Sequence, residues 1–149
     1  MIPSFKQFIN ESWYESPLEK SIRNNQRFID CVIDKAQEVY FGWTQVDGYC
    51  EYYGTGGICD DIAAKITDCI ELYLGMDGVT LYEPSEYHTS AYAVDDEKQI
   101  VIKIDIPFRN YETGAGYTFT KIPNVKFSPD MILIEEQDYE NFNERLKYS

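Results

Sequence analysis

The sequence predicts an α+β fold, and two patterns support that prediction. Over the first half of the chain apolar residues recur every three to four positions, which is typical of helices with one buried side. Over much of the second half apolar and polar residues alternate, which is typical of half-buried strands. Because the helices come first and the strands afterwards, we expect an antiparallel sheet. The chain of 149 residues has the length of one domain with its own core.

Two long helices are expected in the first half. Ser16, followed by a proline, has the chemistry of an N-cap before a first helical position, and predicts a helix over 17–40. The aromatic, glycine-containing segment 41–57 is expected to be a loop. A second helix is expected over 59–74, and Gly75 would end it. The apolar side of the first helix would hold Leu18, Ile22, Ile29, Val32, Ile33, Ala36 and Val39.

The second half is expected to form strands and one short helix. Segments 88–94 and 99–106 are rich in β-forming residues and flank the polar turn DDEK, so they predict a β-hairpin. Further strands are expected over 117–122 and 131–135, and a last helix over 138–147.

The predicted hairpin would bring two polar residues together. A symmetric loop centred between Asp96 and Glu97 places His88 directly opposite Asp105, whatever its length. Directly opposed residues share a face, with Cβ atoms ~4.5–5.5 Å apart. The other face would be core, because it carries four alternating isoleucines, Ile100, Ile102, Ile104 and Ile106. The hairpin therefore predicts a hydrogen bond between His88 and Asp105.

Composition limits the partners of the protein. The formal charge is −13, with 44% hydrophobic and 15% aromatic residues. That charge argues against direct binding to nucleic acid or to an anionic membrane surface, because both need a positive footprint. A basic protein partner or an uncharged substrate fits better.

No targeting segment is predicted. The first residues lack the basic and apolar regions of a secretory signal, and no stretch approaches the ~20 apolar residues of a membrane span, so a cytoplasmic location is expected. The start SFKQFINE resembles the starts of small bacteriophage proteins, for which this would be the cytoplasm of the host.

The four cysteines, Cys31, Cys50, Cys59 and Cys69, are expected to be mostly reduced thiols in that compartment. Cys31 and Cys69 lie on apolar helical faces, and Cys50 lies in the aromatic loop. With no C-x-x-C pair a zinc site has little support, and no cofactor is predicted. A metal site formed by His88 and cysteines is a weaker alternative.

Three residues have the chemistry of a nucleophilic site. Cys59 is expected at a helix N-terminus, where the positive end of the helix dipole favours a thiolate. His88, the only histidine, could take the thiol proton and later donate it to a leaving group. Asp105 could bind the other ring nitrogen and fix the tautomer. A lone histidine is more often structural, so its context decides between the two interpretations.

The same residues resemble a known family. GGICDDIA is similar to the cysteine motif of transglutaminase-like proteins with the papain-like fold, in which G-x-C-x-D/E-x-A opens a helix. HTSAYAV and KIDIP resemble that family's histidine strand and aspartate strand. The resemblance implies a Cys helix packed on an antiparallel sheet, and a thiol enzyme acting on peptide or protein amide bonds. It makes Cys59 the nucleophile, His88 the general base and acid, and Asp105 the orienting group.

Other residues could complete such a site. An oxyanion hole needs donors aimed at the developing charge, for which the backbone N–H of Cys59, the Gln45 amide and the Trp43 indole are candidates. A solvated glutamine and a core tryptophan are the alternative interpretation. Gly57 would keep the approach to the thiol open. Ala91 and Tyr92 lie where many family members carry a tryptophan after the histidine.

Two functions follow as hypotheses. The first is a thiol-dependent acyl-transfer enzyme, whether protease, deamidase or transamidase, that uses Cys59, His88 and Asp105. The second is a non-catalytic acidic protein on the same scaffold that binds or inhibits a basic partner.

Overall fold

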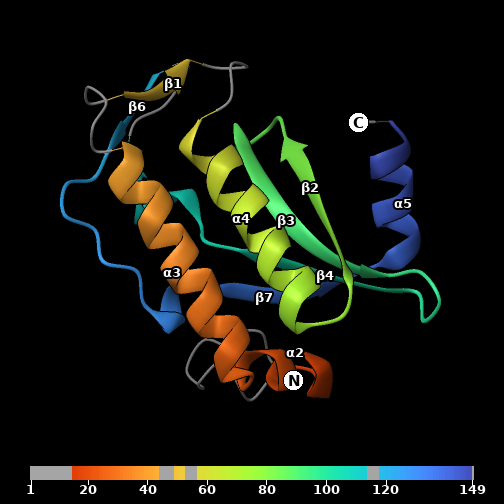
Figure 1. The fold of residues 1–149 in the computed structure, drawn as a ribbon. Helices are drawn as coiled ribbons and strands as arrows, with labels where there is room; N and C mark the ends of the chain where they lie inside the picture. Colours follow the sequence, from red (N-terminus) through yellow and green to blue (C-terminus); the bar gives the residue numbers. More distant parts are fainter. Residues whose placement is uncertain (1–14, 44–48, 53–56, 114–117, 149) are drawn as a thin grey trace, which may run out of the picture.

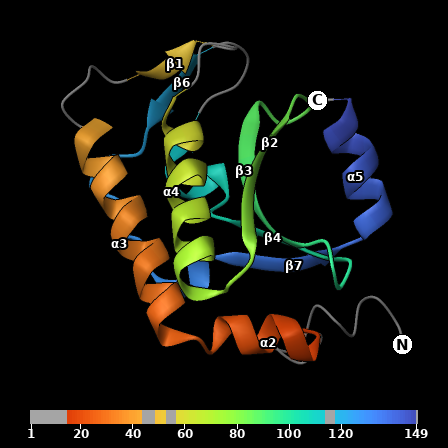
Figure 2. The same ribbon diagram turned by 45° about the vertical axis from the view of Figure 1, so that its right-hand side comes forward.

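The computed structural model has the α+β class that the sequence predicts. Its core is a four-stranded antiparallel sheet with helices on both faces (Figure 1, Figure 2). None of the described helices has the length and apolar character needed to cross a membrane. The residues described are 15–43, 49–52, 57–113 and 118–148.

Helices α3 and α4 lie side by side on one face of this sheet, and α5 covers part of the other face (Figure 2). The short helix α2 lies at one end of α3 and contacts the edge of the sheet. The bounds of the described α-helices are Pro17–Arg23 for α2, Gln26–Trp43 for α3, Ile58–Tyr73 for α4 and Tyr139–Lys147 for α5.

The large sheet has the strand order β2-β3-β4-β7, and every neighbouring pair is antiparallel. A small sheet of order β1-β6-β5 lies near the C-terminal end of α3 (Figure 1). The large sheet consists of β2 (Asp77–Glu83), β3 (His88–Asp95), β4 (Ile100–Asp105) and β7 (Leu133–Gln137). The small sheet consists of β1 (Tyr49–Tyr52), β5 (Glu112–Thr113) and β6 (Thr118–Lys121).

The first predicted helix is in fact two helices. Asn24 ends α2, and the side chain of Asn25 accepts a hydrogen bond from the backbone N–H of Phe28 at 3.1 Å, as an N-cap does. The apolar spacing continues through this break, so periodicity alone predicted one helix. The capping function of Ser16 is confirmed, because its side chain accepts from the N–H of Glu19 at 3.1 Å.

Several strand predictions need correction. Strand β2 was not predicted; it is an edge strand, and Leu81 is the only buried residue among its seven. Segment 41–57 is only partly a loop, since α3 extends to Trp43 and β1 lies within it. Strand β7 begins two residues later than predicted, after a 3-10 turn at Pro129–Met131. The end of α4 is as predicted, with Gly75 at φ +64° just after the C-cap.

The two faces of the large sheet hold different cores. The face toward α3 and α4 buries Ile102, Ile104 and Ile106 completely, so the isoleucine face is the core face as predicted. The face toward α5 carries a smaller cluster made of Leu81, Tyr92, Val94, Val101 and Phe142. Side chains at alternate positions of one strand therefore lie in two separate layers.

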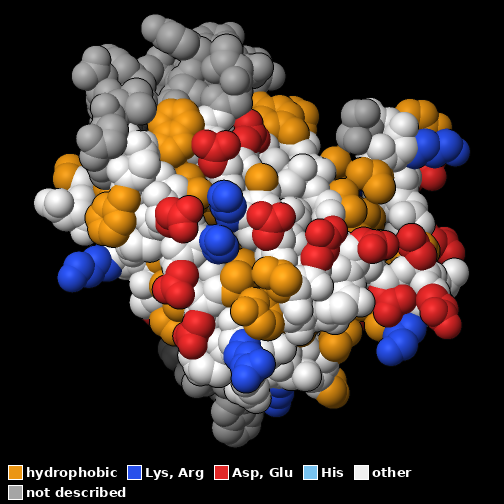
Figure 3. All heavy atoms as spheres, in the orientation of Figure 1, with side chains coloured by type: hydrophobic (Ala, Val, Ile, Leu, Met, Phe, Trp, Pro, Cys, Tyr) orange, Lys and Arg blue, Asp and Glu red, His pale blue; other side chains and the backbone are white. Residues whose placement is uncertain are grey.

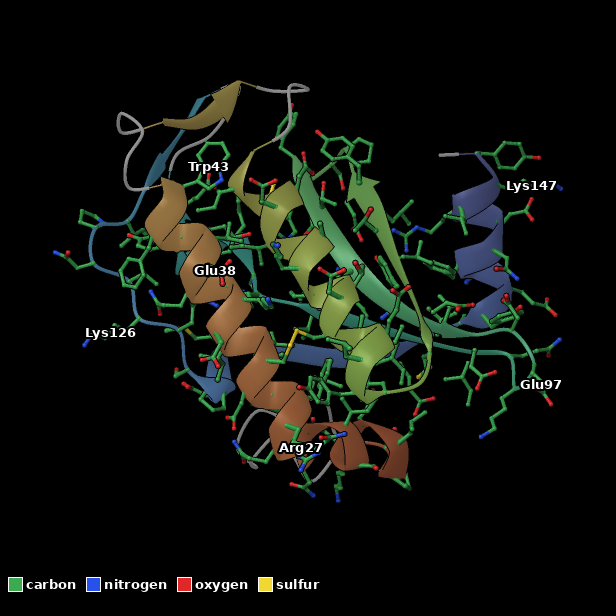
Figure 4. All side chains as sticks on the ribbon, in the orientation of Figure 1. Arg27, Glu38, Trp43, Glu97, Lys126 and Lys147 are labelled. Atoms are coloured by element: carbon green, nitrogen blue, oxygen red, sulfur yellow. A yellow bond between two sulfur atoms is a disulfide. The ribbon has the colours of Figure 1, made fainter. Side chains whose placement is uncertain are left out.

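A disulfide joins α3 and α4, which corrects the prediction that these cysteines are reduced. Cys31 and Cys69 are bonded, with their Cα atoms 5.9 Å apart. The yellow bond in Figure 4 lies between the two helices. Both cysteines were expected on apolar helical faces, but sequence periodicity does not say which faces meet.

Candidate active site

His88 and Asp105 form a buried pair at one end of the sheet. His88 is the first residue of β3 and Asp105 is the last residue of β4. Nε2 of His88 lies 3.0 Å from each carboxylate oxygen of Asp105. The two residues are 4% and 5% exposed. Because an ionised carboxylate can only accept, Nε2 carries the proton and Nδ1 carries the lone pair of the neutral ring.

The predicted contact is confirmed, but the predicted register is wrong. Ala91 pairs with Ile104, and Asp95 pairs with Ile100, so the loop comprises residues 96–99. Its centre lies between Glu97 and Lys98, one position later than predicted. Gln99 takes a positive φ of 55° in this turn. The resulting two-residue shift places His88 diagonally from Asp105. An even shift keeps every side chain on its predicted face, and a diagonal neighbour lies within reach of a long side chain.

Cys59 lies in the first turn of α4 and belongs to the core on the isoleucine face of the sheet, whereas alternation along β3 and β4 places His88 and Asp105 on the face toward α5. The N-cap is Gly57, which has no side chain to bond the first N–H groups of the helix. Cys59 is 3% exposed and is not part of a disulfide. The helix dipole favours a thiolate here. Asp60 and Asp61, which follow directly, oppose that charge.

A hydrogen bond ties the start of α4 to the start of β3. The hydroxyl of Thr89 donates to the carboxylate of Asp60. Each of these residues is the direct neighbour of a predicted catalytic residue, His88 in one case and Cys59 in the other. Figures 1 and 2 show the start of α4 and the start of β3 at the same end of the molecule. Asp60 therefore connects α4 to β3. From the sequence it was considered only as a negative charge next to Cys59.

The second ring nitrogen of His88, Nδ1, makes no hydrogen bond to the described residues. This nitrogen is buried. The ring of Phe108 lies against the imidazole, with centroids 5.5 Å apart. Phe108 follows β4 in a 3-10 turn, Phe108–Asn110, and was not predicted as part of the site. An aromatic neighbour limits the access of water to the imidazole.

The remaining predicted residues have different surroundings. The indole N–H of Trp43 donates to Asp61 at 2.9 Å, so it is engaged at the start of α4. Figure 4 shows Trp43 at the end of α3, next to that helix start. Tyr92 is fully buried in the layer toward α5, and its hydroxyl donates to Glu83. Gln45 lies outside the described residues.

A hollow of about 490 Å³ adjoins the first turns of α4. Its lining comes from the end of α3 and from α4, and consists of Val39, Gly42, Trp43, Asp61, Ala64 and Lys65. Acidic side chains are spread over this face of the molecule in Figure 3. The hollow is thus largely apolar, with charges of both signs in its lining.

A charged network that was not predicted lies beyond the pair, toward α5. Glu83 accepts from the Tyr92 hydroxyl, and forms ion pairs with Lys103 at 3.4 Å and with Arg145 at 3.1 Å. Burial by itself raises the pKa of Glu83, but the hydrogen bond from Tyr92, the charge of Lys103 and the bond from Arg145 outweigh it and lower the pKa to about 2. Burial and the bond to Glu83 raise the pKa of Tyr92 well above its ordinary value. Glu83 therefore stays ionised.

The described residues contain no group of three His, Cys, Asp or Glu side chains that could hold a metal ion. Comparison with protein-family models, with curated proteins and with solved structures found no match.

Proposed function

We propose that this protein is a thiol-dependent acyl-transfer enzyme in which Cys59 attacks the carbonyl carbon of a peptide or protein amide. The observation that carries the proposal is the buried His88–Asp105 pair with its unused Nδ1, at the start of β3, which lies at the same end of the molecule as the start of α4 (Figure 1). A cysteine nucleophile needs a histidine that uses both ring nitrogens: one donates to the orienting carboxylate, and the other accepts the thiol proton.

The reaction would proceed in two stages. In the first, Nδ1 of His88 takes the thiol proton while the sulfur of Cys59 adds to the carbonyl carbon, which gives a tetrahedral oxyanion. The C–N bond then breaks, the nitrogen leaves with the proton from Nδ1, and a thioester remains. In the second stage water or an amine attacks the thioester, gives its proton to Nδ1, and the thiol is regained when that proton returns to sulfur.

The surroundings of the pair support these roles. Asp105 holds the proton on Nε2 throughout and stabilises the imidazolium that forms between the steps. The oxyanion would be met by N–H groups at the start of α4, because Gly57 supplies no side chain to cap them. The hollow beside Trp43 and Asp61 would receive a side chain of the substrate.

The same arrangement supports a papain-like, or transglutaminase-like, scaffold. In that scaffold a helix that begins at the cysteine packs on an antiparallel sheet carrying the histidine and the aspartate on neighbouring strands. Here α4 packs on β3, and His88 and Asp105 come from the neighbouring strands β3 and β4.

The test is the reactivity of Cys59 toward iodoacetamide near neutral pH, read by mass spectrometry of peptides. We expect Cys59 to react faster in the folded protein than in urea, and faster than Cys50 of the same chain. Asp105→Asn and His88→Gln should each slow it about a hundredfold, because each removes the base or its correct tautomer. Cys59 reacting at equal rates in all three folded proteins would rule the proposal out.

A second candidate function is a non-catalytic acidic protein that binds a basic partner. The charge of −13 and the burial of Cys59 favour it. In that case a basic protein partner would be captured equally by the wild type and by Cys59→Ala, and released by salt because exposed charges are screened. Capture that depends on Cys59 would instead favour the enzyme.

A further inference from the structure

A serine that the catalytic scheme does not use lies beside Asp105. Ser90 is 0% exposed, and its Oγ has no hydrogen-bond partner in the described part of the chain. It lies on the same face of β3 as His88, two residues away. The pairing of β3 with β4 ends at Ala91 and Ile104, and Ser90 and Asp105 are the next residues of the two strands beyond that pair. The serine therefore lies one position past the last paired residues, on the strand next to the orienting carboxylate.

The carboxylate of Asp105 has few donors. Among the described residues its side chain accepts only from Nε2 of His88, which is shared between both oxygens. A carboxylate offers about four acceptor positions. Its paired cross-strand neighbour is Leu133 on β7, which has no polar side-chain atom. A buried charge with one donor is costly, so a second donor within reach is favoured.

The nearby cations are already engaged with another carboxylate. Lys103 lies on the same face of β4 as Asp105, and Arg145 extends from α5, but both are paired with Glu83. Glu83 is the cross-strand partner of His88 on β2. From α4, Asp60 adds a negative charge that is bonded to Thr89. Ser90 is therefore a buried neutral donor without a partner among the described residues, on the same face of the sheet as Asp105.

We propose that Ser90 is a positioning residue that donates its hydroxyl proton to Asp105. Opposed Cβ atoms on neighbouring antiparallel strands lie ~4.5–5.5 Å apart, so we expect another χ1 rotamer of Ser90 to bring Oγ within hydrogen-bonding range of the carboxylate. A carboxylate held by His88 on one side and Ser90 on another cannot turn away from Nε2. The proton then stays on Nε2, and Nδ1 keeps its lone pair. Only the catalytic consequence of this hydrogen bond rests on the proposed function.

The chain has one histidine, which makes the test direct. Protein labelled with ¹⁵N-histidine has a single pair of ring nitrogen signals, and their chemical shifts report which nitrogen carries the proton. In the wild type we expect the Nε2–H tautomer alone. In Ser90→Ala we expect a mixture with the Nδ1–H tautomer. Ser90→Thr keeps the hydroxyl and should restore the wild-type shifts. Identical ring shifts in wild type and Ser90→Ala would overturn the proposal.

Leu81→Ala is the matched control for loosened packing. Leu81 is buried and is the cross-strand neighbour of Ser90 on β2, but it carries no donor. It should lower the melting temperature more than Ser90→Ala, yet leave the ring shifts unchanged. Ring shifts that change equally in Leu81→Ala and Ser90→Ala would also overturn the proposal, because they would report packing alone.

The alkylation rate separates this inference from the proposed function. If both the positioning role of Ser90 and the enzyme function are correct, Ser90→Ala should slow the reaction of Cys59 with iodoacetamide about tenfold. This is the effect expected for the loss of one hydrogen bond to a charged group. If the ring shifts change in Ser90→Ala while Cys59 is inert in the wild type, the positioning role stands and the enzyme function fails. If Cys59 is reactive and the ring shifts do not change, the enzyme function stands and the role of Ser90 fails.

Discussion

The two faces of the large sheet are stabilised in different ways. The face toward α3 and α4 is a continuous apolar core, reinforced by the disulfide between these helices. The face toward α5 combines a small apolar cluster with polar groups, which are the partly exposed Glu83 network and the buried His88–Asp105 pair. A single strand supplies both, since Ala91 and Ala93 point one way and Ser90 and Tyr92 the other.

The apolar layer toward α3 and α4 and the polar layer toward α5 therefore have different roles. Apolar burial is the larger source of stability and tolerates no polar group without a partner. The polar layer contributes less to stability, but it holds ionisable side chains in one orientation, as a reactive site requires. The start of α4, where Cys59 lies, is at the same end of the molecule as the start of β3, where His88 lies. The following predictions test this division, beginning with the largest effect.

Loss of the disulfide should cause the largest change, and should affect the apolar layer. The bond joins residues 38 positions apart, for which the entropy of loop closure corresponds to about 4 kcal/mol. We therefore expect dithiothreitol to lower the urea midpoint of the wild type. The double variant Cys31→Ala, Cys69→Ala should have a low midpoint that dithiothreitol does not change. A wild type with the same midpoint in both conditions would show that this bond does not stabilise the protein.

Truncation of one isoleucine should cost more than removal of one hydroxyl from the other face. Ile104→Ala leaves a cavity in the apolar layer, and we expect a loss of about 3 kcal/mol in the free energy of unfolding. Tyr92→Phe keeps the ring but removes the bond to Glu83, and we expect a loss of about 1.5 kcal/mol. Urea unfolding of both variants checks the order. The reverse order would mean that the polar layer is the main source of stability.

Strand β2 passes so close to α4 that it has no room for a side chain at Gly78. A Cβ there would lie 2.6 Å from Cβ and 2.7 Å from the carbonyl oxygen of Thr67. Gly78→Ala should therefore lower the free energy of unfolding by about 2 kcal/mol, measured by thermal unfolding. Gly42→Ala is the matched control, because nothing lies within 4 Å of its added Cβ and alanine favours the helix. Equal melting temperatures for the two variants would contradict this close approach.

The smallest effect should come from acid, through the polar layer. The pKa of Glu83 is lowered from 4.5 to about 2, so the charged form stabilises the fold above about pH 4.5, and this contribution is lost as the pH falls toward 2. Glu83→Gln removes that contribution, so its stability should fall less than that of the wild type over this interval, by about 1 kcal/mol. Glu97→Gln, at an exposed turn position shown in Figure 4, is the control and should follow the wild type. Melting temperatures measured across the interval test this, and parallel curves for all three proteins would contradict it.

Part of the site could be predicted because it depends on alternation. The parity of a strand follows from its sequence, so His88 and Asp105 were placed on one face and the isoleucines on the other, even though the register was wrong by two residues. The turn geometry that sets the register was not predictable, because DDEK contains no glycine or asparagine to mark the position with positive φ, which is Gln99. Phe108 and Ser90 carried no signal of their own. Their importance depends on which residues lie opposite them.

The sequence by itself determined the α+β class, the end of α4 at Gly75, the helix start that carries Cys59, and the chemistry of the three candidate catalytic residues. These features depend on local propensity, capping and periodicity, which neighbouring residues specify. Only the tertiary structure decided that Cys31 bonds to Cys69 and that β2 forms the edge of the sheet. It also decided that Glu83 contacts Tyr92, Lys103 and Arg145. Each of these depends on which helical faces and strands pack together, and pairings between distant segments are not encoded in any local pattern.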